Sequence, residues 1–141
     1  MIKNLADYFE EQQEFYLDKI SYNRIEIGVQ APKHMLNCID RIEANVNEDI
    51  VKLTVSRTIK FDPEEIFKLT VIYGAILKFK KEKKEDYKWR EIDLAKEFKE
   101  NGGFVLENLI SRTSLLIAEI TSSFGQPPVI LPPVVVTPKE N

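Results

Sequence analysis

Residues 104–133 read FVLENLISRTSLLIAEITSSFGQPPVILPP, and this is the most informative stretch of the chain. Its apolar residues recur at the three- and four-residue spacing of an amphipathic helix, which we expect over Phe104–Phe124. Gly125 follows where a helix commonly ends in a left-handed residue. The four prolines that come next exclude both helix and central strand, so residues 125–136 should form an extended apolar strap. A long apolar helix followed by this strap offers more apolar surface than one small domain easily buries.

Upstream of the helix, the sequence alternates with the period of β-structure. The clearest strand is Val51–Phe61, where apolar and polar residues alternate and predict one buried and one wet face. A first strand is expected over Phe15–Val29, with a bulge near Asn23–Arg24 where the apolar parity changes. Residues 42–46 alternate on the opposite parity to Val51–Phe61, so a bend or bulge is expected at residues 47–49.

A third long strand is expected over Ile66–Phe79, after the turn residues 62–65. It is apolar on both parities, so its middle should be covered on both faces. The helix would cover one face, and a second sheet or a partner subunit the other.

The whole chain, residues 1–141, is predicted to be one α+β domain, with an antiparallel sheet over residues 15–79 and the long helix packed on one face. Residues 1–14 read as a helical lead-in, residues 80–88 as a solvated charged loop, and residues 89–124 as helices. The segment Trp89–Asn101 is expected to be a short helix closed by Gly102–Gly103.

Composition favours a cytoplasmic globular protein. Hydrophobic residues make up 43% and charged residues 30%, and the net charge of −3 gives no general attraction to nucleic acid or to an anionic membrane. No secretory signal or membrane span is evident, and a lone cysteine cannot form an intrachain disulfide.

The sequence holds few residues in catalytic arrangements, so we do not expect an enzyme, a cofactor or a metal. His34 and Cys38 could form a nucleophile–base pair, but an exposed loop histidine and a small buried thiol are the simpler interpretation. Two such residues are too few for a metal site. The run Ser111–Ser114 could be a polar site, or could face solvent and bond back to the preceding helical turn.

Two segments resemble the SecB-type export chaperones and their SecB-like relatives. The first is F-x-L-x-x-I at residues 15–20, continued by Ile25, Ile27 and Ala31–Pro32; the second is the helix with its glycine end and proline-containing strap. The resemblance covers roughly Phe15–Val136. It implies a four-stranded antiparallel sheet with a helical layer, assembled as a dimer of dimers. It also implies an ATP-independent holdase that keeps client chains unfolded in hydrophobic surface grooves.

Two departures limit what the resemblance implies. Export members dock their motor ATPase through acidic residues of the first strand, where this chain has Arg24 and Gly28. The chain also ends soon after the strap, without the second C-terminal helix and basic metal-binding tail of those members. A generic holdase is therefore favoured over docking to the export motor ATPase, and a dedicated client such as an antitoxin is an alternative.

The resemblance and the apolar pattern together nominate two sets of site residues and two alternative functions. One alternative is a lipid or small-ligand protein that uses the same apolar surface, and the other is a structural oligomerisation or adaptor domain. The oligomer is expected to be a homotetramer. The predicted client-binding residues are Met35, Leu36, Ile39, Phe124, Val129, Ile130 and Leu131, and the predicted oligomer-interface residues are Leu69, Val71, Ile72 and Ile76.

Overall fold

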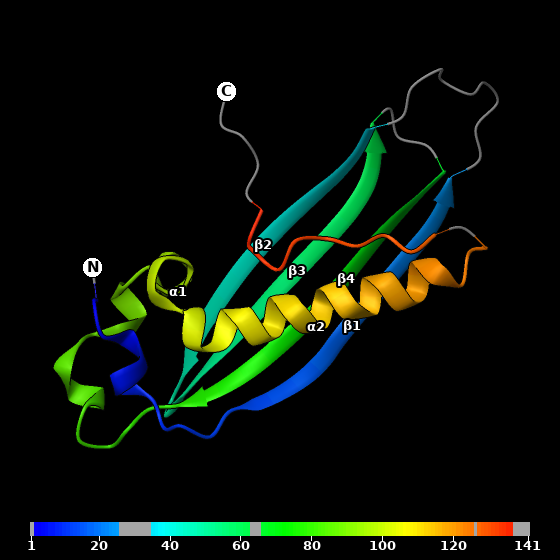
Figure 1. Ribbon diagram of the computed structural model, residues 1–141. Coiled ribbons are helices and arrows are strands. Elements are labelled where there is room, and N and C mark those ends of the chain that lie inside the picture. The colour runs from blue at the N-terminus through cyan, green and yellow to red at the C-terminus, as the bar shows by residue number, and fades with distance from the viewer. Residues whose placement is uncertain (1, 26–34, 63–65, 126, 137–141) are drawn as a thin grey trace.

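Four long antiparallel strands form one sheet, and a 20-residue helix crosses one of its faces (Figure 1). The computed structural model describes residues 2–25, 35–62, 66–125 and 127–136. The strand order is β1-β4-β3-β2. This arrangement confirms the predicted α+β fold. The elements are β1 (Glu14–Ile25), β2 (Met35–Asn47), β3 (Ile50–Asp62), β4 (Ile66–Lys78) and the long helix α2 (Gly103–Ser122).

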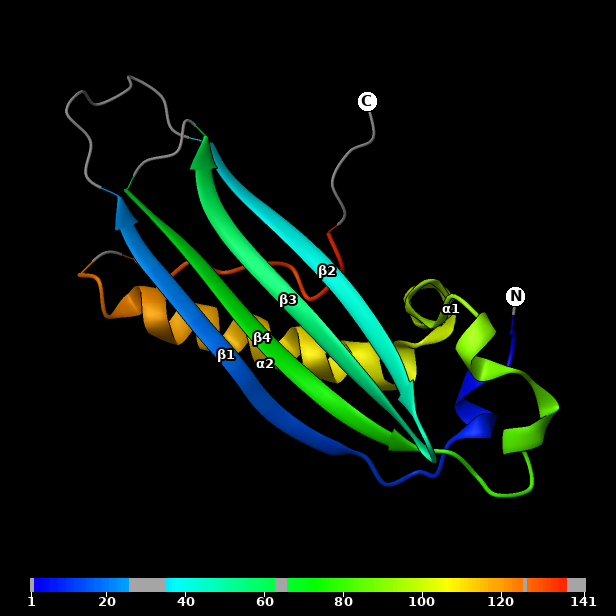
Figure 2. The same ribbon diagram turned by 180° about the vertical axis from the view of Figure 1, so that it is seen from behind.

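The alternating sequence of β3 places its odd-numbered side chains under α2. Val51, Leu53 and Val55 are fully buried, whereas the even-numbered residues between them are partly or fully exposed. Register pairs such as Val55 with Tyr73 extend the same buried row onto β4. We call this side the covered face and the opposite side the open face. Figure 2 shows the open face with no helix in front of it.

The bend predicted at residues 47–49 is a tight turn that joins β2 to β3. Asn47 and Ile50 form the last register pair, and Glu48 takes a left-handed conformation with φ 53°. The Lys84 Nζ atom donates to Asp49 Oδ1 at 2.6 Å, which ties the turn to the charged loop that follows β4.

The bulge in β1 lies earlier than the sequence pattern predicted. The register with β4 shifts between Leu17 and Lys19, not near Asn23–Arg24. An extra residue at Asp18 brings Ile20 onto the same face as Leu17, and the strand then continues in regular register to Ile25. The predicted continuation through Ile27 and Val29 lies outside the described residues.

The segment before α2 contains less helix than predicted. It has a 3-10 turn, η3 (Trp89–Glu91), followed by the helix α1 (Leu94–Asn101). Helix α1 begins after Asp93, whose side chain caps it by accepting from the Lys96 N–H. Gly102 joins α1 to α2, and a Cβ there would lie 2.3 Å from the Phe98 carbonyl oxygen. Only glycine therefore fits this junction. The lead-in contains one 3-10 turn, η1 (Leu5–Tyr8), and the charged loop contains another, η2 (Lys84–Asp86).

The core has two clusters along the covered face. The first lies under the N-terminal half of α2 and is rich in aromatic rings, such as Phe9 stacked on Phe79 with centroids 4.9 Å apart. The second contains Ile59, Phe67, Leu69, Val71 and Ile117.

The two clusters correct part of the predicted oligomer interface. Leu69 and Val71 have no exposed surface, because α2 covers them within the same chain, so they are core residues rather than partner contacts. Ile72 and Ile76 lie on the open face and are partly buried. Within one chain, the middle of β4 is thus covered by a helix on one face only.

The extended strap follows α2 as predicted. Gly125 has φ 79°, the left-handed conformation that favours glycine. From there the strap runs across the covered face towards β2 (Figure 1). The Asp40 N–H donates to the Val136 carbonyl oxygen at 2.8 Å, so the end of the strap bonds to the outer edge of β2.

Candidate functional site

A buried ion pair between β3 and β2 anchors the strap. Arg57 and Asp40 are register partners on the covered face, and both side chains are fully buried. Arg57 Nε donates to Asp40 Oδ1 at 2.8 Å, and Arg57 Nη2 donates to Asp40 Oδ2 at 2.9 Å. Burial disfavours the charged guanidinium, but the hydrogen bond and charge of Asp40 outweigh this and raise the Arg57 pKa.

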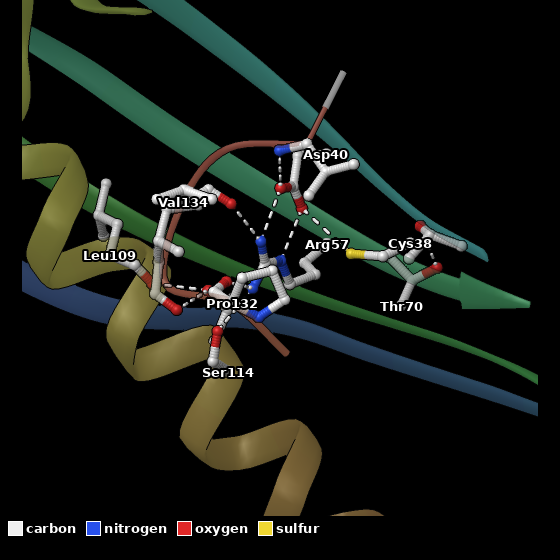
Figure 3. Close-up of polar contacts among 12 residues, drawn as sticks. Cys38, Asp40, Arg57, Thr70, Leu109, Ser114, Pro132 and Val134 are labelled. Atoms are coloured by element: carbon white, nitrogen blue, oxygen red, sulfur yellow. Dashed lines mark hydrogen bonds and ion pairs between the residues drawn. The ribbon is translucent and has the colours of Figure 1, made fainter. Parts of the chain in front are cut away.

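The remaining donors of Arg57 bind the strap and α2. Nη1 donates to the Pro132 carbonyl oxygen at 2.8 Å and to Ser114 Oγ at 2.6 Å, while Nη2 donates to the Val134 carbonyl oxygen at 2.7 Å (Figure 3). All five N–H donors of the guanidinium are thereby used. Asp40 Oδ2 also accepts from the Val136 N–H at 2.6 Å. One ion pair therefore joins two strands, the helix and the strap.

An apolar groove lies beside the first part of the strap. Its volume is about 500 Å³, and it opens between the end of α2, the strap and the ends of β1, β3 and β4. Tyr22 and Phe67 both pack against Phe124, with ring centroids 5.2 Å apart in each pair. The lining residues are Tyr22, Arg24, Phe61, Ile66, Phe67, Thr121, Phe124, Pro127 and Val129.

Thr121 holds the strap wall of this groove in place. Its Oγ1 accepts from the Val129 N–H at 2.8 Å and donates to the Ile117 carbonyl oxygen at 2.8 Å. The hydroxyl is buried, so both bonds are protected from competing water. The wall is thus fixed to the helix at one end and to Arg57 at the other.

The four predicted client-binding residues of the C-terminal region have different environments. Phe124 and Val129 line the groove. Leu131 packs against the second core cluster, whereas Ile130 is 75% exposed and is not among the lining residues. The strap thus directs alternate side chains inward and outward.

The three predicted client-binding residues of β2 lie on two different faces of the sheet, and none of them lines the groove. Met35 and Ile39 occupy open-face register positions, opposite Asp62 and Thr58, while Leu36 pairs with Phe61 on the covered face. The prediction grouped them by their apolar character, and strand alternation separates them. Met35 and Ile39 therefore lie on the other side of the sheet from the groove.

The sequence pattern missed most of the residues that line the groove. Tyr22 and Phe67 come from strands that are distant in sequence, and their proximity depends on the β1–β4 register. A signal for the anchor was present, however. Arg57 stands in the buried odd-numbered row of β3, and Asp40 stands on the same parity as Ile42 in β2. Opposite charges inside two apolar rows point to a buried pair.

The structure gives ordinary structural contacts to the polar residues considered for catalysis. Burial raises the pKa of the Cys38 thiol to about 11, which keeps it protonated at neutral pH, and His34 lies outside the described residues. Thr113 donates to the Leu109 carbonyl oxygen at 2.7 Å, the back-bonding that the sequence suggested. The Arg112 guanidinium lies over the Phe15 ring at 4.9 Å. No group of three potential metal ligands occurs among the described residues.

Comparison with known proteins defines the fold class as SecB-like. The fold resembles that of the SecB-like chaperone of Mycobacterium tuberculosis, solved in complex with a ChAD peptide from the HigA1 antitoxin. The TM-score is 0.67 at 12% sequence identity, over 92% of this chain and 90% of the other. A protein of unknown function from Streptococcus agalactiae is also similar, with a TM-score of 0.45 at 16% identity, over 88% of this chain and 98% of that one.

Sequence comparison adds no relative. No family model matches the chain, and no curated protein sequence does either. In the described part of the chain, no helix is both long and apolar enough to cross a membrane.

Proposed function

We propose that the protein is an ATP-independent holdase that binds unfolded polypeptides in the groove beside the strap. The observation that carries this proposal is the open aromatic groove itself, on a fold shared with a chaperone that was solved with a bound peptide. The groove leaves Tyr22 and Ile66 more than 40% exposed, although both are large apolar side chains. Exposed apolar surface is typical of binding sites, and it supports this role for the groove.

The groove suits clients of varied sequence. Burying one Leu, Ile or Phe side chain contributes about 1.5–3 kcal/mol, so a few such contacts give useful affinity without a specific motif. The walls are already ordered by Thr121 and by the Arg57 anchor, so binding need not order them. Arg24 at the rim adds one charge that can select among clients.

The decisive experiment measures suppression of aggregation of an unrelated, heat-unfolded reporter protein without ATP. The wild type should suppress aggregation at near-stoichiometric ratios. A Tyr22→Ser/Ile66→Asn variant should lose most of this activity, because it removes the two exposed apolar walls of the groove. Ile66 has φ 69°, which asparagine tolerates better than a β-branched residue, so the variant should still fold.

The matched control is Leu115→Ser. Leu115 is 62% exposed on α2 and does not line the groove. Its loss should leave aggregation suppression unchanged. A wild-type protein that fails to suppress aggregation, or a groove variant as active as the Leu115 control, would refute the proposal.

The client could be general, as in protein export, or a single partner such as an antitoxin. The similar mycobacterial chaperone was solved with an antitoxin peptide, which supports the dedicated form. A toxin–antitoxin pair encoded beside the gene would identify the antitoxin as the dedicated client. If the protein serves export, it should co-purify with the export motor ATPase. Failure to co-purify would exclude a role in export.

A small apolar ligand is the second candidate, because the groove volume of about 500 Å³ falls in the range of small-molecule sites. Native mass spectrometry of the purified protein would decide between a polypeptide client and a small apolar ligand. A lipid retained at one per chain, together with no aggregation suppression, would favour the ligand-binding function. An oligomerisation or adaptor domain is the interpretation if both assays are negative.

We further propose that the protein is a homo-oligomer that uses the β1 edge. β1 is an edge strand, and its covered-face residues Leu17 and Ile20 are 47% and 44% exposed. An unpaired edge beside exposed apolar side chains is a template for pairing with a second copy. Light scattering should give a multimer at micromolar concentration, and a monomer would exclude this assembly. Leu17→Asp should shift the mass towards the monomer.

A further inference from the structure

The open face of the sheet carries four positively charged side chains, in the first and third of three successive cross-strand rows. Lys60 and Lys68 are register partners in the first row, while Lys19 pairs with Ile72, and Arg41 pairs with Ser56, in the third. We call these four residues the basic patch. The other open-face positions of these rows, all on the described strands, hold hydroxyl, amide or aliphatic side chains: Ser21, Asn23, Asn37, Ile39, Ser56, Thr58, Thr70 and Ile72.

The patch contains an unfavourable arrangement that the fold does not require. Lys60 and Lys68 stand directly opposite each other, and like charges at such positions destabilise a sheet. Among the described residues, neither ammonium group has an ion-pair partner. The bordering acidic residues are Asp18 at the bulge, Asp62 beyond Lys60, and Glu43, whose carboxylate is 3.9 Å from Arg41 with both side chains exposed. A bound anion would relieve the repulsion between the two lysines.

The same rows form a shallow hollow that can hold such an anion. Its volume is about 340 Å³, and its lining includes Arg41, Lys60 and Lys68. The hydroxyls of Thr58 and Thr70 are hydrogen-bonded to each other at 2.8 Å. In such a pair one hydroxyl donates, and the other keeps its own hydrogen for a ligand. The hollow therefore offers charge and a neutral donor at one place.

We propose that the basic patch docks an acidic, extended polypeptide segment of a partner protein. Side chains on one face of an extended peptide repeat about every 6.6–6.8 Å, which is also the spacing of successive rows along a strand. Acidic residues at alternate peptide positions would then meet successive rows of the patch. The open face has no helix or strap in front of it (Figure 2), so the segment could reach the patch while a client occupies the groove.

A nucleic acid fits the patch less well. The chain has a net charge of −3, so a long polyanion would be repelled by the rest of the molecule. The residues that line the hollow include no aromatic ring on which a base could stack. An acidic segment of modest charge needs neither an overall positive protein nor a stacking platform.

The test is fluorescence anisotropy of a labelled 12-residue peptide of alternating Glu and Ser, titrated with the full chain at low and at physiological salt. The wild type should bind saturably, and more weakly at the higher salt. Lys60→Gln/Lys68→Gln should weaken binding at least tenfold. The matched control, Lys81→Gln/Lys88→Gln, removes the same charge from exposed positions in the loop after β4 and should bind like the wild type.

Three results would overturn the proposal: no binding by the wild type, equal weakening in both variants, or tighter binding of a 12-nucleotide oligothymidylate than of the acidic peptide. Loss of folding does not confuse the test, because removing the lysine pair relieves repulsion, and the thermal midpoint should stay equal or rise. The patch variant should also suppress aggregation like the wild type. The peptide titration therefore tests the basic patch whether or not the groove binds clients.

Discussion

Arg57 and Asp40 face each other in register on β3 and β2 and form a bidentate ion pair under the strap, with N–O distances of 2.8 and 2.9 Å. Taking two charges out of water is unfavourable unless their remaining hydrogen-bonding capacity is also met. Here the strap meets it, through the Pro132 and Val134 carbonyl oxygens and the Val136 N–H. The pair and the strap therefore depend on each other.

Arg57→Met should destabilise the protein strongly. It leaves Asp40 charged and buried without its partner, which typically costs about 3–5 kcal/mol. Urea unfolding measures the loss, and the strap should become sensitive to proteolysis before the sheet does. The double variant Arg57→Met/Asp40→Leu should lose less than Arg57→Met alone. Equal stability of Arg57→Met and wild type would contradict the anchoring role.

Ile130→Ser and Leu131→Ser should differ although the residues are neighbours. Leu131 packs against the second core cluster, so its loss should reduce the free energy of unfolding by about 1–3 kcal/mol. Ile130 is 75% exposed, so its replacement should change stability by less than about 0.5 kcal/mol. Thermal and urea unfolding of the two single variants would check this. Equal effects would mean that the strap does not alternate as described.

Thr121→Val should detach the wall of the groove at modest cost. Valine has the same shape but cannot accept from the Val129 N–H, which leaves that partly buried donor unpaired at a cost of about 1–3 kcal/mol. Aggregation suppression should fall with it. The control is Ser122→Ala in the next position, because the Ser122 hydroxyl is exposed and bonds only back to the Glu119 carbonyl oxygen. A Thr121 variant as stable as this control would argue against the contact.

Gly74→Ala should be tolerated only together with a change at Tyr16. A Cβ at Gly74 would lie 2.2 Å from the Tyr16 ring, so the ring must move and the alanine variant should lose about 1–3 kcal/mol. In a Tyr16→Ser background the same substitution should cost much less. A double-mutant cycle by urea unfolding measures this coupling, and simple additivity would show that the ring does not rest on the glycine.

Cys38 should react slowly with a disulfide reagent in the folded protein and faster as the pH rises towards 11. Burial raises its pKa to about 11 from an ordinary value of 9.0, so the folded state holds this proton more tightly than the unfolded state. The contribution to stability is therefore complete below pH 9 and is lost as the pH rises from 9 to 11. Reaction rates in buffer and in urea, measured from pH 7 to 11, check the shift. A folded-state rate that already levels off near pH 9 would disprove it.

The local pattern of the sequence was sufficient for the elements themselves. The alternation in Val51–Phe61 marked β3 and its buried face, and the apolar spacing before Gly125 marked α2 and its end. Both signals are short-range, because a strand or an amphipathic helix shows its period within one segment. The same pattern placed the bulge of β1 wrongly, because a bulge at either position brings a different set of apolar residues onto one face, and only pairing with β4 selects Asp18.

Local sequence patterns are enough to define the strands, the long helix, the glycine that ends it and the extended strap. Tertiary structure decided which residues meet. It alone places Arg57 and Asp40 beneath the strap, puts Met35 and Ile39 on the open face, and brings Tyr22 of β1 against Phe124 beyond α2. The physical reason is that these contacts depend on register between strands far apart in the chain. A shift of one residue would turn every side chain to the other face.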